Sequence, residues 1–241
     1  MRLYMNVPRA AIPAAPHKMG LESKAKTLER LIADKALNAV AIDMIAGPSE
    51  ILIIADGKND PAHLAADMLA QSEHDKLASA ILITDSQDLA ERVSAEIESQ
   101  VVKLIRHDIA RVSIDDNGAI VIVSEIADAV RIANDIAPEH LELCIDNPFE
   151  VLTRIRNAGS VFLGRHSPEA LGDYYAGPNH TLPTMGTARF SSPLGVEDFV
   201  KRTQYIYYTD EALRCVAGDI EKFAESEGLT GHARSITIRT E

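Results

Sequence analysis

Along most of the chain, short apolar runs alternate with longer stretches in which apolar and polar residues follow a helical period. The first run, residues 39–56, contains an apolar segment, a Gly-Pro-Ser turn and a β-branched strand over 51–54. Short apolar runs bounded by turn residues are typical of strands buried on both faces of a sheet. Four further strands are expected at residues 80–85, 119–124, 140–146 and 160–164.

Helical stretches fill the intervals between these strands. Asn59 and Asp60 supply capping side chains and Pro61 suits a first turn, so a helix is expected to begin here and to run to about Glu73. Strands separated by single helices predict an α/β fold, with helices layered around a mainly parallel sheet. Further helices are expected at residues 86–105, beginning at Ser86, at 125–136, and at 147–158, capped by Asn147.

The remaining segments have a different character. Residues 1–20 are rich in proline and alanine without periodicity, which predicts a disordered or poorly packed arm, and residues 21–37 predict an amphipathic helix. Residues 165–196 are rich in Gly, Pro, Ser and Thr and predict a long functional loop. A polar helix at about 209–226 leads to a short tail. Three regions follow: an N-terminal arm and helix (1–38), an α/β domain (39–190) and a small C-terminal helical tail (191–241).

Composition narrows the class of protein. The 241 residues are 46% hydrophobic and 25% charged, which is ordinary for a globular protein, and the formal net charge of -12 argues against nucleic-acid binding. No apolar run is long enough for a membrane span, and early prolines interrupt any signal-peptide core. Two cysteines, Cys144 and Cys215, are too few for a disulfide framework and are expected to be reduced thiols of a cytoplasmic protein.

Two motifs place metal-binding or proton-transferring groups at the ends of predicted helices. Gln71 and His74 stand at i and i+3 on one helical face, so they could converge on an ion such as zinc. A solvated helix end is the ordinary alternative.

The second motif follows the next predicted helix. Pro138 should stop that helix at Ala137, which leaves Glu139 and His140 at the start of a strand. An adjacent acid and imidazole suit paired proton transfers, although a salt-bridged pair would have the same sequence.

Two further pairs lie in the C-terminal third. Asp173 and His180 belong to the glycine-rich stretch 172–184, where Asp173 could be an oxygen ligand for zinc or could form an Asx turn. Glu227 and His232 lie near the C-terminus, where such residues are usually exposed.

Taken together, the motifs resemble histidinol dehydrogenase, in order and with compatible spacing, over about residues 39–241. The matching segments are AIDMIAGPSEILIIAD (41–56), AADMLAQSEHD (65–75), APEHLEL (137–143), GSVFLG followed by SPEALGDYYAGPNHTLPT (159–184), SSPLGVEDFVKR (191–202) and LTGHARSI (229–236). Members of that family oxidise L-histidinol to L-histidine in two NAD-dependent steps through a bound histidinaldehyde. The resemblance therefore implies an oxidoreductase of histidine biosynthesis with one zinc per subunit.

The resemblance also implies roles for individual residues. Zinc would be held by Gln71, His74 and Asp173 of one subunit of a homodimer and by the partner subunit's His232, and it would orient the substrate's imidazole and amino nitrogens. His140 would be the main base, and Glu139 would activate the water that adds to the aldehyde. Three other residues would contact the substrate: Ser49, His180 and Glu227.

The sequence departs from the family pattern in its N-terminal segment. A nucleotide-binding segment with a GPGN-like stretch is expected before residue 41, where residues 1–38 stand instead. Most NAD contacts are therefore expected to be missing, so the domain is an incomplete Rossmann-like one. Two alternatives to an active oxidoreductase stay open: a non-catalytic zinc- and imidazole-binding remnant of that enzyme, and a metal hydrolase that uses the same ligands.

Overall fold

A computed structural model describes residues 2–5 and 44–241 of this chain. The chain divides into two compact units, Met1–Phe199 and Val200–Glu241, each of which is described by itself. The division lies later than the boundary predicted after residue 190. The helix predicted at residues 21–37 lies outside the described residues.

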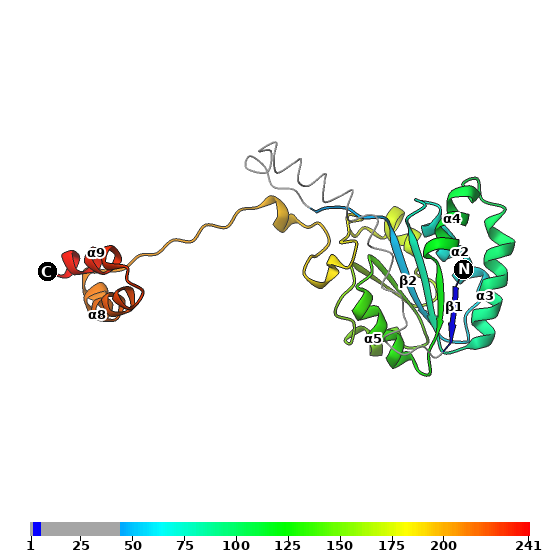
Figure 1. The fold of residues 1–241 in the computed structure, drawn as a ribbon, viewed down its shortest axis with the longest axis horizontal. Helices are drawn as coiled ribbons and strands as arrows, with labels where there is room; N and C mark the ends of the chain where they lie inside the picture. Colours follow the sequence, from blue (N-terminus) through cyan, green and yellow to red (C-terminus); the bar gives the residue numbers. More distant parts are fainter. Residues whose placement is uncertain (1, 6–43) are drawn as a thin grey trace. The chain divides into compact units, whose positions relative to one another are not determined.

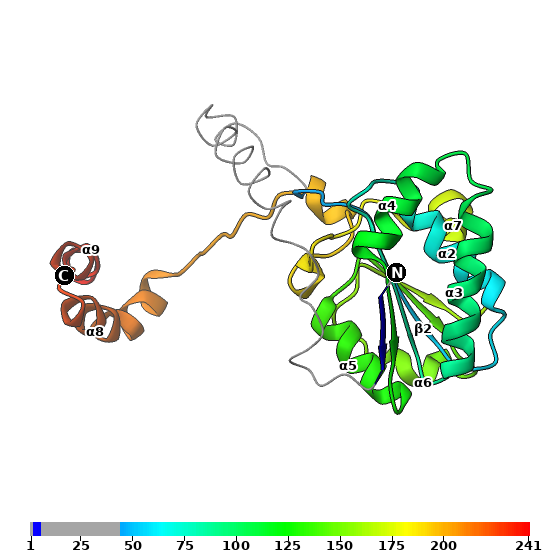
Figure 2. The same cartoon turned by 45° about the vertical axis from the view of Figure 1, so that its right-hand side comes forward.

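The first unit is built on a six-stranded parallel sheet with the strand order β1-β4-β3-β2-β5-β6 (Figures 1 and 2). This arrangement confirms the predicted α/β fold with a parallel sheet, and five of its strands match the predicted ones. The strands are β1 (Arg2–Met5), β2 (Glu50–Ala55), β3 (Ser79–Thr84), β4 (Ala119–Ile122), β5 (His140–Cys144) and β6 (Ser160–Leu163).

The edge strand β1 was not predicted. Arg2 pairs with Ala119 and Met5 pairs with Ile122 in a parallel ladder, so the prediction of a poorly packed arm is wrong for these residues. The first proline of the chain is Pro8, beyond the strand, so every residue of β1 has a backbone N–H that the ladder can use.

Helices cover both faces of the sheet, as Figures 1 and 2 show. Alternation along β2 sends Ile51 and Ile53 to one face and Leu52 and Ile54 to the other, and all four are buried. The first face is covered by α2 (Pro61–Ser72), α3 (Gln87–Val101) and α4 (His107–Asn117), and the second by α5 (Ile126–Ile136) and α6 (Pro148–Leu152). The central strand is therefore buried on both sides, as its uninterrupted apolar run predicts.

Local signals placed several helix ends correctly. The Asp60 carboxylate accepts a hydrogen bond from the Ala62 N–H at the start of α2, and the Ser86 hydroxyl caps α3 by accepting from Leu89 N–H. Helix α5 ends at Ile136, and Ala137, just before Pro138, takes a left-handed conformation with φ 57°. An alanine in this region costs on the order of 1 kcal/mol, a strain that is most often found at functional sites.

Two helices differ from prediction. Helix α4 was missed because its buried face consists of small or isolated side chains, Ala110, Ser113 and Ile114, which give little hydrophobic period. Helix α6 ends at Leu152 instead of 158, and Asn147 makes no capping hydrogen bond. The backbone N–H groups of Arg156 and Asn157 donate to the Asn134 side chain on α5 instead of continuing the helix.

The predicted long loop after β6 contains several short helical turns, and the C-terminal unit is helical as expected. Residues 230–240 form a helix where a short tail was predicted, because pairing with the neighbouring helix outweighs the β-branched residues of the segment. The turns are α7 (Glu169–Leu171), the π-helix η3 (Gly172–Ala176), η4 (Thr187–Arg189) and η5 (Val196–Phe199), and the helices are α8 (Asp210–Ser226) and α9 (Thr230–Thr240). In the described residues, the length and hydropathy that a bilayer-spanning helix needs are not found together in any helix.

Candidate functional site

The predicted catalytic pair lies at the amino edge of the sheet. His140 is the first residue of β5, Glu139 precedes it, and Glu50 begins the neighbouring strand β2. In open parallel sheets ligands usually bind at the carboxyl edge. Here that edge is closed by ion pairs, because the Arg165 guanidinium bonds Asp56 after β2 at 2.6 Å and Asp146 after β5 at 2.9 Å.

The backbone of Glu50 positions both members of the pair. Its N–H donates to the Glu139 Oε2 atom at 3.0 Å, and its carbonyl oxygen lies 3.0 Å from His140 Nδ1. A carbonyl oxygen can only accept, so Nδ1 carries the proton and neutral His140 presents a bare Nε2. The Glu139 Oε2 atom also lies 3.6 Å from His140 Nδ1. Strand pairing between β2 and β5 thus sets the tautomer of the imidazole.

The His140 Nε2 atom faces carboxylates of the loop that follows β6. It lies 3.9 Å from Glu169 Oε1 and 4.0 Å from Asp173 Oδ1. The nitrogen is fully buried and has no hydrogen-bond partner among the described residues. A buried polar atom without a partner costs about 1–3 kcal/mol, so this atom is placed for a ligand or a reacting group.

Asp173 and His180 come together with His140 in one group. The His180 Nδ1 atom lies 2.7 Å from Asp173 Oδ1, and ligand atoms of these three residues lie within 4.8 Å of one another. Asp173 belongs to the π-helix η3, and both it and His180 line a pocket of about 200 Å³ beside Phe162 and Leu171. A carboxylate and two imidazoles are zinc-type ligands, so this cluster could hold a divalent metal.

Gln71 and His74 lie at the end of α2, which runs back to the same edge of the sheet as the start of β5. The Gln71 side chain is 1% exposed, and its Oε1 atom has no hydrogen-bond partner within the described part of the chain. His74 is exposed and lies outside the close group of His140, Asp173 and His180. The buried, unpartnered amide oxygen of Gln71 is the atom that the predicted zinc site requires.

Burial shifts the pKa of both Glu139 and His140. Desolvation raises the pKa of Glu139 to about 8, against the opposing hydrogen bond from Glu50 N–H. Desolvation also lowers the pKa of His140, which favours the neutral imidazole at physiological pH. The pair therefore combines a neutral base with a carboxyl that can gain or lose a proton near neutrality.

Three carboxyls with a raised pKa were not recognised from the sequence: Glu142 and Glu169 are buried and Asp67 is half-buried. Desolvation is the largest cause that raises the pKa of Glu142 to about 8, of Glu169 to about 8 and of Asp67 to about 6. The Glu142 Oε1 atom accepts from the Glu169 N–H at 2.8 Å and so attaches the loop to β5. The glutamate in the middle of the apolar strand His-Leu-Glu-Leu-Cys was the available signal, because a charged side chain there needs partners.

Two hydrogen bonds attach the loop to the turn before β2. The Gly47 N–H donates to Thr184 Oγ1 at 2.6 Å, and the Met185 N–H donates to Glu50 Oε1 at 3.0 Å. Ser49, a predicted substrate contact, lies in this turn, and its carbonyl accepts from Ser79 N–H. The turn thus connects Ser49 and Glu50 to the loop that carries Asp173.

The predicted residues Glu227 and His232 belong to the C-terminal unit. Glu227 is the C-cap of α8 and His232 lies in the first turn of α9, and both side chains are exposed. The two residues are separated by a short turn in which Gly228 takes a φ of 73°. Their contribution to the site stays a prediction.

We expect Gly159→Ala to destabilise the protein, because the backbone of Glu139 lies too close to Gly159 to leave room for a side chain. An added Cβ would lie 2.6 Å from the Glu139 carbonyl oxygen and 3.2 Å from Pro183 Cδ. Such overpacking costs about 1–3 kcal/mol. Urea unfolding measures the change, with Gly218→Ala in α8 as the control, since nothing lies within 4 Å of its added Cβ. Equal stability of the two variants would show that Gly159 is not packed tightly against the backbone of Glu139.

Comparisons with known proteins identify the family of the chain. A model of the histidinol dehydrogenase family matches residues 30–240. The chain is similar to the histidinol dehydrogenases of Geobacter metallireducens and Clostridium acetobutylicum, each 56% identical over 200 residues that make up 83% of this chain and 46% of the relative. The crystal structure of histidinol dehydrogenase from Elizabethkingia anophelis superposes with a TM-score of 0.78 at 38% identity, over 86% of this chain and 48% of that one.

The chain therefore spans about half the length of the curated relatives that it matches. The matched half contains every predicted metal and acid–base residue, from Gln71 to His232. On the family match and these identities, the chain belongs to the histidinol dehydrogenase family.

Proposed function

We propose that this chain is the zinc-binding, proton-transferring part of an oxidoreductase that converts L-histidinol to L-histidine with NAD. The observation that carries the proposal is the His140 Nε2 atom, which is buried, has no hydrogen-bond partner among the described residues and faces Asp173, while Glu139 lies beside the other ring nitrogen, Nδ1. This arrangement supports His140 as a base that accepts a proton from a substrate bound at the metal.

The residues of the site fit zinc. The amide oxygen of Gln71 is buried and has no hydrogen-bond partner among the described residues, Asp173 supplies a carboxylate oxygen, and His74 lies three residues after Gln71, in the turn that follows α2. We propose these three as ligands, with the partner subunit's His232 as the fourth. When bound, zinc supplies a cationic anchor for the substrate's imidazole and amino nitrogens.

The carboxyl edge of the described sheet does not fit NAD. A pyrophosphate usually sits at the N-terminus of the helix after a strand of such a sheet. Here the N-terminus of α2 is capped by the Asp60 carboxylate, and Asp56 lies beside it at the end of β2. The Asp60 charge repels a phosphate, and the Arg165 guanidinium is already paired with Asp56 and Asp146, so this described edge does not suit a pyrophosphate.

Two proton transfers belong to the residues of this chain. Neutral His140 takes the hydroxyl proton of the alcohol at Nε2, because Nδ1 is occupied by the Glu50 carbonyl. Glu139 takes a proton from the water that adds to the aldehyde, and its pKa of about 8 lets it act near neutral pH. His180, Ser49 and Glu227 are proposed as substrate contacts.

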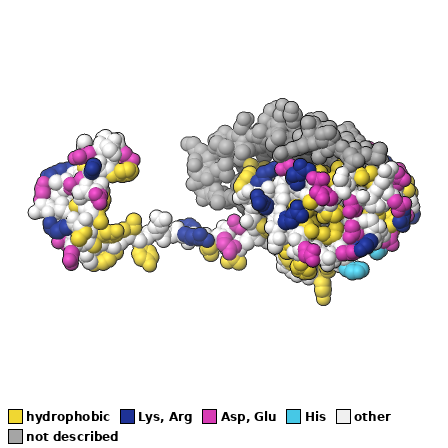
Figure 3. Space-filling view, turned by 90° about the horizontal axis from the view of Figure 1, so that it is seen from below, with side chains coloured by type: hydrophobic (Ala, Val, Ile, Leu, Met, Phe, Trp, Pro, Cys, Tyr) yellow, Lys and Arg dark blue, Asp and Glu magenta, His cyan; other side chains and the backbone are white. Residues whose placement is uncertain are grey.

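We also propose a homodimer in the cytoplasm. The buried side chains of α8 and α9 are three alanines, whereas Phe223 is 67% and Ile238 is 52% exposed. Figure 3 shows hydrophobic side chains on the surface of this unit. Such a helix pair supports packing against a second copy, which would bring the partner's His232 to the site. The free thiols Cys144 and Cys215 are consistent with a reducing compartment.

Calorimetry with zinc and L-histidinol tests the metal site directly. We expect Gln71→Leu and Asp173→Asn each to weaken zinc binding at least about tenfold, since each removes one ligand of a preformed set. Asp88→Asn, an exposed residue of α3, is the matched control and should bind zinc as the unchanged protein does. Full zinc affinity in both site variants would refute the proposed ligands.

A second candidate, the non-catalytic zinc- and imidazole-binding remnant, is favoured by the misfit of NAD at the described sheet edge. Both candidates predict zinc-dependent histidinol binding. They differ in NADH production once the chain is mixed with an N-terminal half taken from a relative. NADH formation supports the oxidoreductase, and zinc-dependent binding without NADH supports the remnant.

A further inference from the structure

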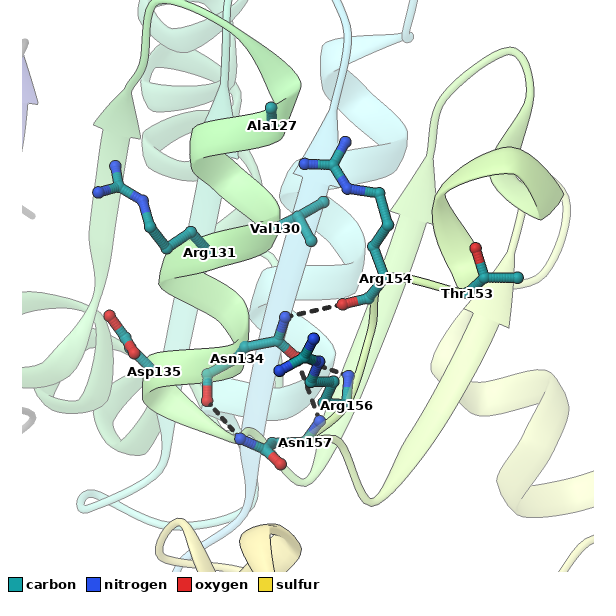
Figure 4. A pocket seen from close by; sticks show the side chains of 9 residues that line it. All are labelled: Ala127, Val130, Arg131, Asn134, Asp135, Thr153, Arg154, Arg156 and Asn157. Atoms are coloured by element: carbon teal, nitrogen blue, oxygen red, sulfur yellow. Dashed lines mark hydrogen bonds between the residues drawn. The ribbon is translucent and has the colours of Figure 1, made fainter.

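A second pocket lies on the other helical face of the sheet, away from the site described above. It has a volume of about 480 Å³ and lies between α5 and the segment 153–157 that joins α6 to β6. Figure 4 shows the two walls, and the Val130 side chain points from α5 toward the other wall. The volume is within the range of small-molecule sites, about 300–1,000 Å³.

The charge of this pocket is unusual for a chain with a net charge of -12. Among the arginines whose side chains the structure describes, only Arg154, Arg156 and Arg202 have no hydrogen-bond or ion-pair partner. Two of these three line the pocket. The one carboxyl of its lining, that of Asp135, points to the opposite side of α5 in Figure 4.

The two free arginines are presented by a rigid segment. The Asn134 side chain donates to the Arg154 carbonyl at 2.9 Å and accepts from the Arg156 N–H at 2.6 Å. Asn157 returns a hydrogen bond to the Asn134 carbonyl at 2.9 Å, as the dashed lines of Figure 4 show. One amide on α5 therefore fixes the backbone of both arginines, which reduces the entropy lost when a ligand binds.

We propose that this pocket binds a small organic phosphate. Guanidinium groups bind phosphate through paired, charge-assisted hydrogen bonds, and two of them are free here. Figure 4 shows the Arg154 guanidinium at the end of the pocket near Ala127 and the Arg156 guanidinium at the end near Asn157. Both side chains are exposed and would turn toward a phosphate bound between them, with Ala127 and Val130 beside the apolar part of the ligand. The site is separate from the zinc residues, so it does not depend on the proposed oxidoreductase activity.

Calorimetry of the metal-free protein with phenyl phosphate tests this site. The expected result is saturable binding at one site, about tenfold weaker in each of Arg154→Gln and Arg156→Gln and absent in the double variant. Arg202→Gln, the third unpartnered arginine, is the matched control and should bind as the unchanged protein does. Because the substituted side chains are exposed and unpartnered, the variants should fold normally, and circular dichroism checks this.

Two further ligands, inorganic phosphate and benzoate, show which part of phenyl phosphate the pocket recognises. Weaker binding of inorganic phosphate supports the contact with Ala127 and Val130, and equal binding overturns it. Benzoate that binds as tightly as phenyl phosphate overturns the assignment to phosphate. No saturable binding to the unchanged protein, or equal binding to the double variant, overturns the site itself.

Discussion

Replacing His140 with asparagine should reduce turnover by a factor on the order of 10²–10⁴ while zinc binding stays nearly unchanged. His140 Nδ1 is used by the Glu50 carbonyl, and Nε2 is the only ring nitrogen left to accept a proton. Asparagine has no titratable group in this range. The assay is NADH formation by the chain combined with an N-terminal half of a relative, and zinc affinity is measured in parallel.

His107→Asn, on the exposed surface of α4, is the control for this substitution and should leave both quantities unchanged. A parallel loss of zinc and turnover in His140→Asn would contradict the role of base. It would mean that His140 is itself a ligand, an arrangement that its closeness to Asp173 and His180 also permits. The experiment therefore separates the two roles of one imidazole.

Replacing Glu142 with glutamine should make the stability of the protein less dependent on pH. Burial raises the pKa of this carboxyl from an ordinary value of 4.5 to about 8, so the folded protein binds the proton more tightly than the unfolded chain. The stability that the protonated group contributes is complete below about pH 4.5 and is lost as the pH rises towards 8. Glutamine stays neutral throughout and keeps a carbonyl oxygen for the Glu169 N–H.

Urea unfolding of metal-free protein between pH 5 and pH 8.5 measures this effect. At the upper end the variant should exceed the unchanged protein by a free energy of unfolding on the order of 2 kcal/mol, with a smaller difference at pH 5. Glu125→Gln, an exposed position before α5, should follow the unchanged protein at every pH. Identical pH profiles of Glu142→Gln and the unchanged protein would show that folding does not raise the pKa of Glu142.

The sequence by itself determined five strands and four helices of the main unit and singled out Glu139 and His140 as a candidate acid–base pair. Apolar runs predict strands, and short-range signals such as Asp60, Ser86 and Pro138 start or stop helices, because each acts through backbone groups within a few residues. Glu139 and His140 were identifiable for the same reason, as neighbours at a helix-to-strand junction. The roles of Gln71 and Asp173 came from the resemblance to a family.

Only the tertiary structure decided which atoms are free to act. The pairing of β1 with β4, the contact of Glu142 with Glu169, and the use of His140 Nδ1 by Glu50 all join residues that are far apart in the chain. The amide of Asn134 likewise ends α6 and presents Arg154 and Arg156 from a segment 20 or more residues away. Such contacts arise from packing between elements, and a local pattern of polar and apolar residues does not contain them.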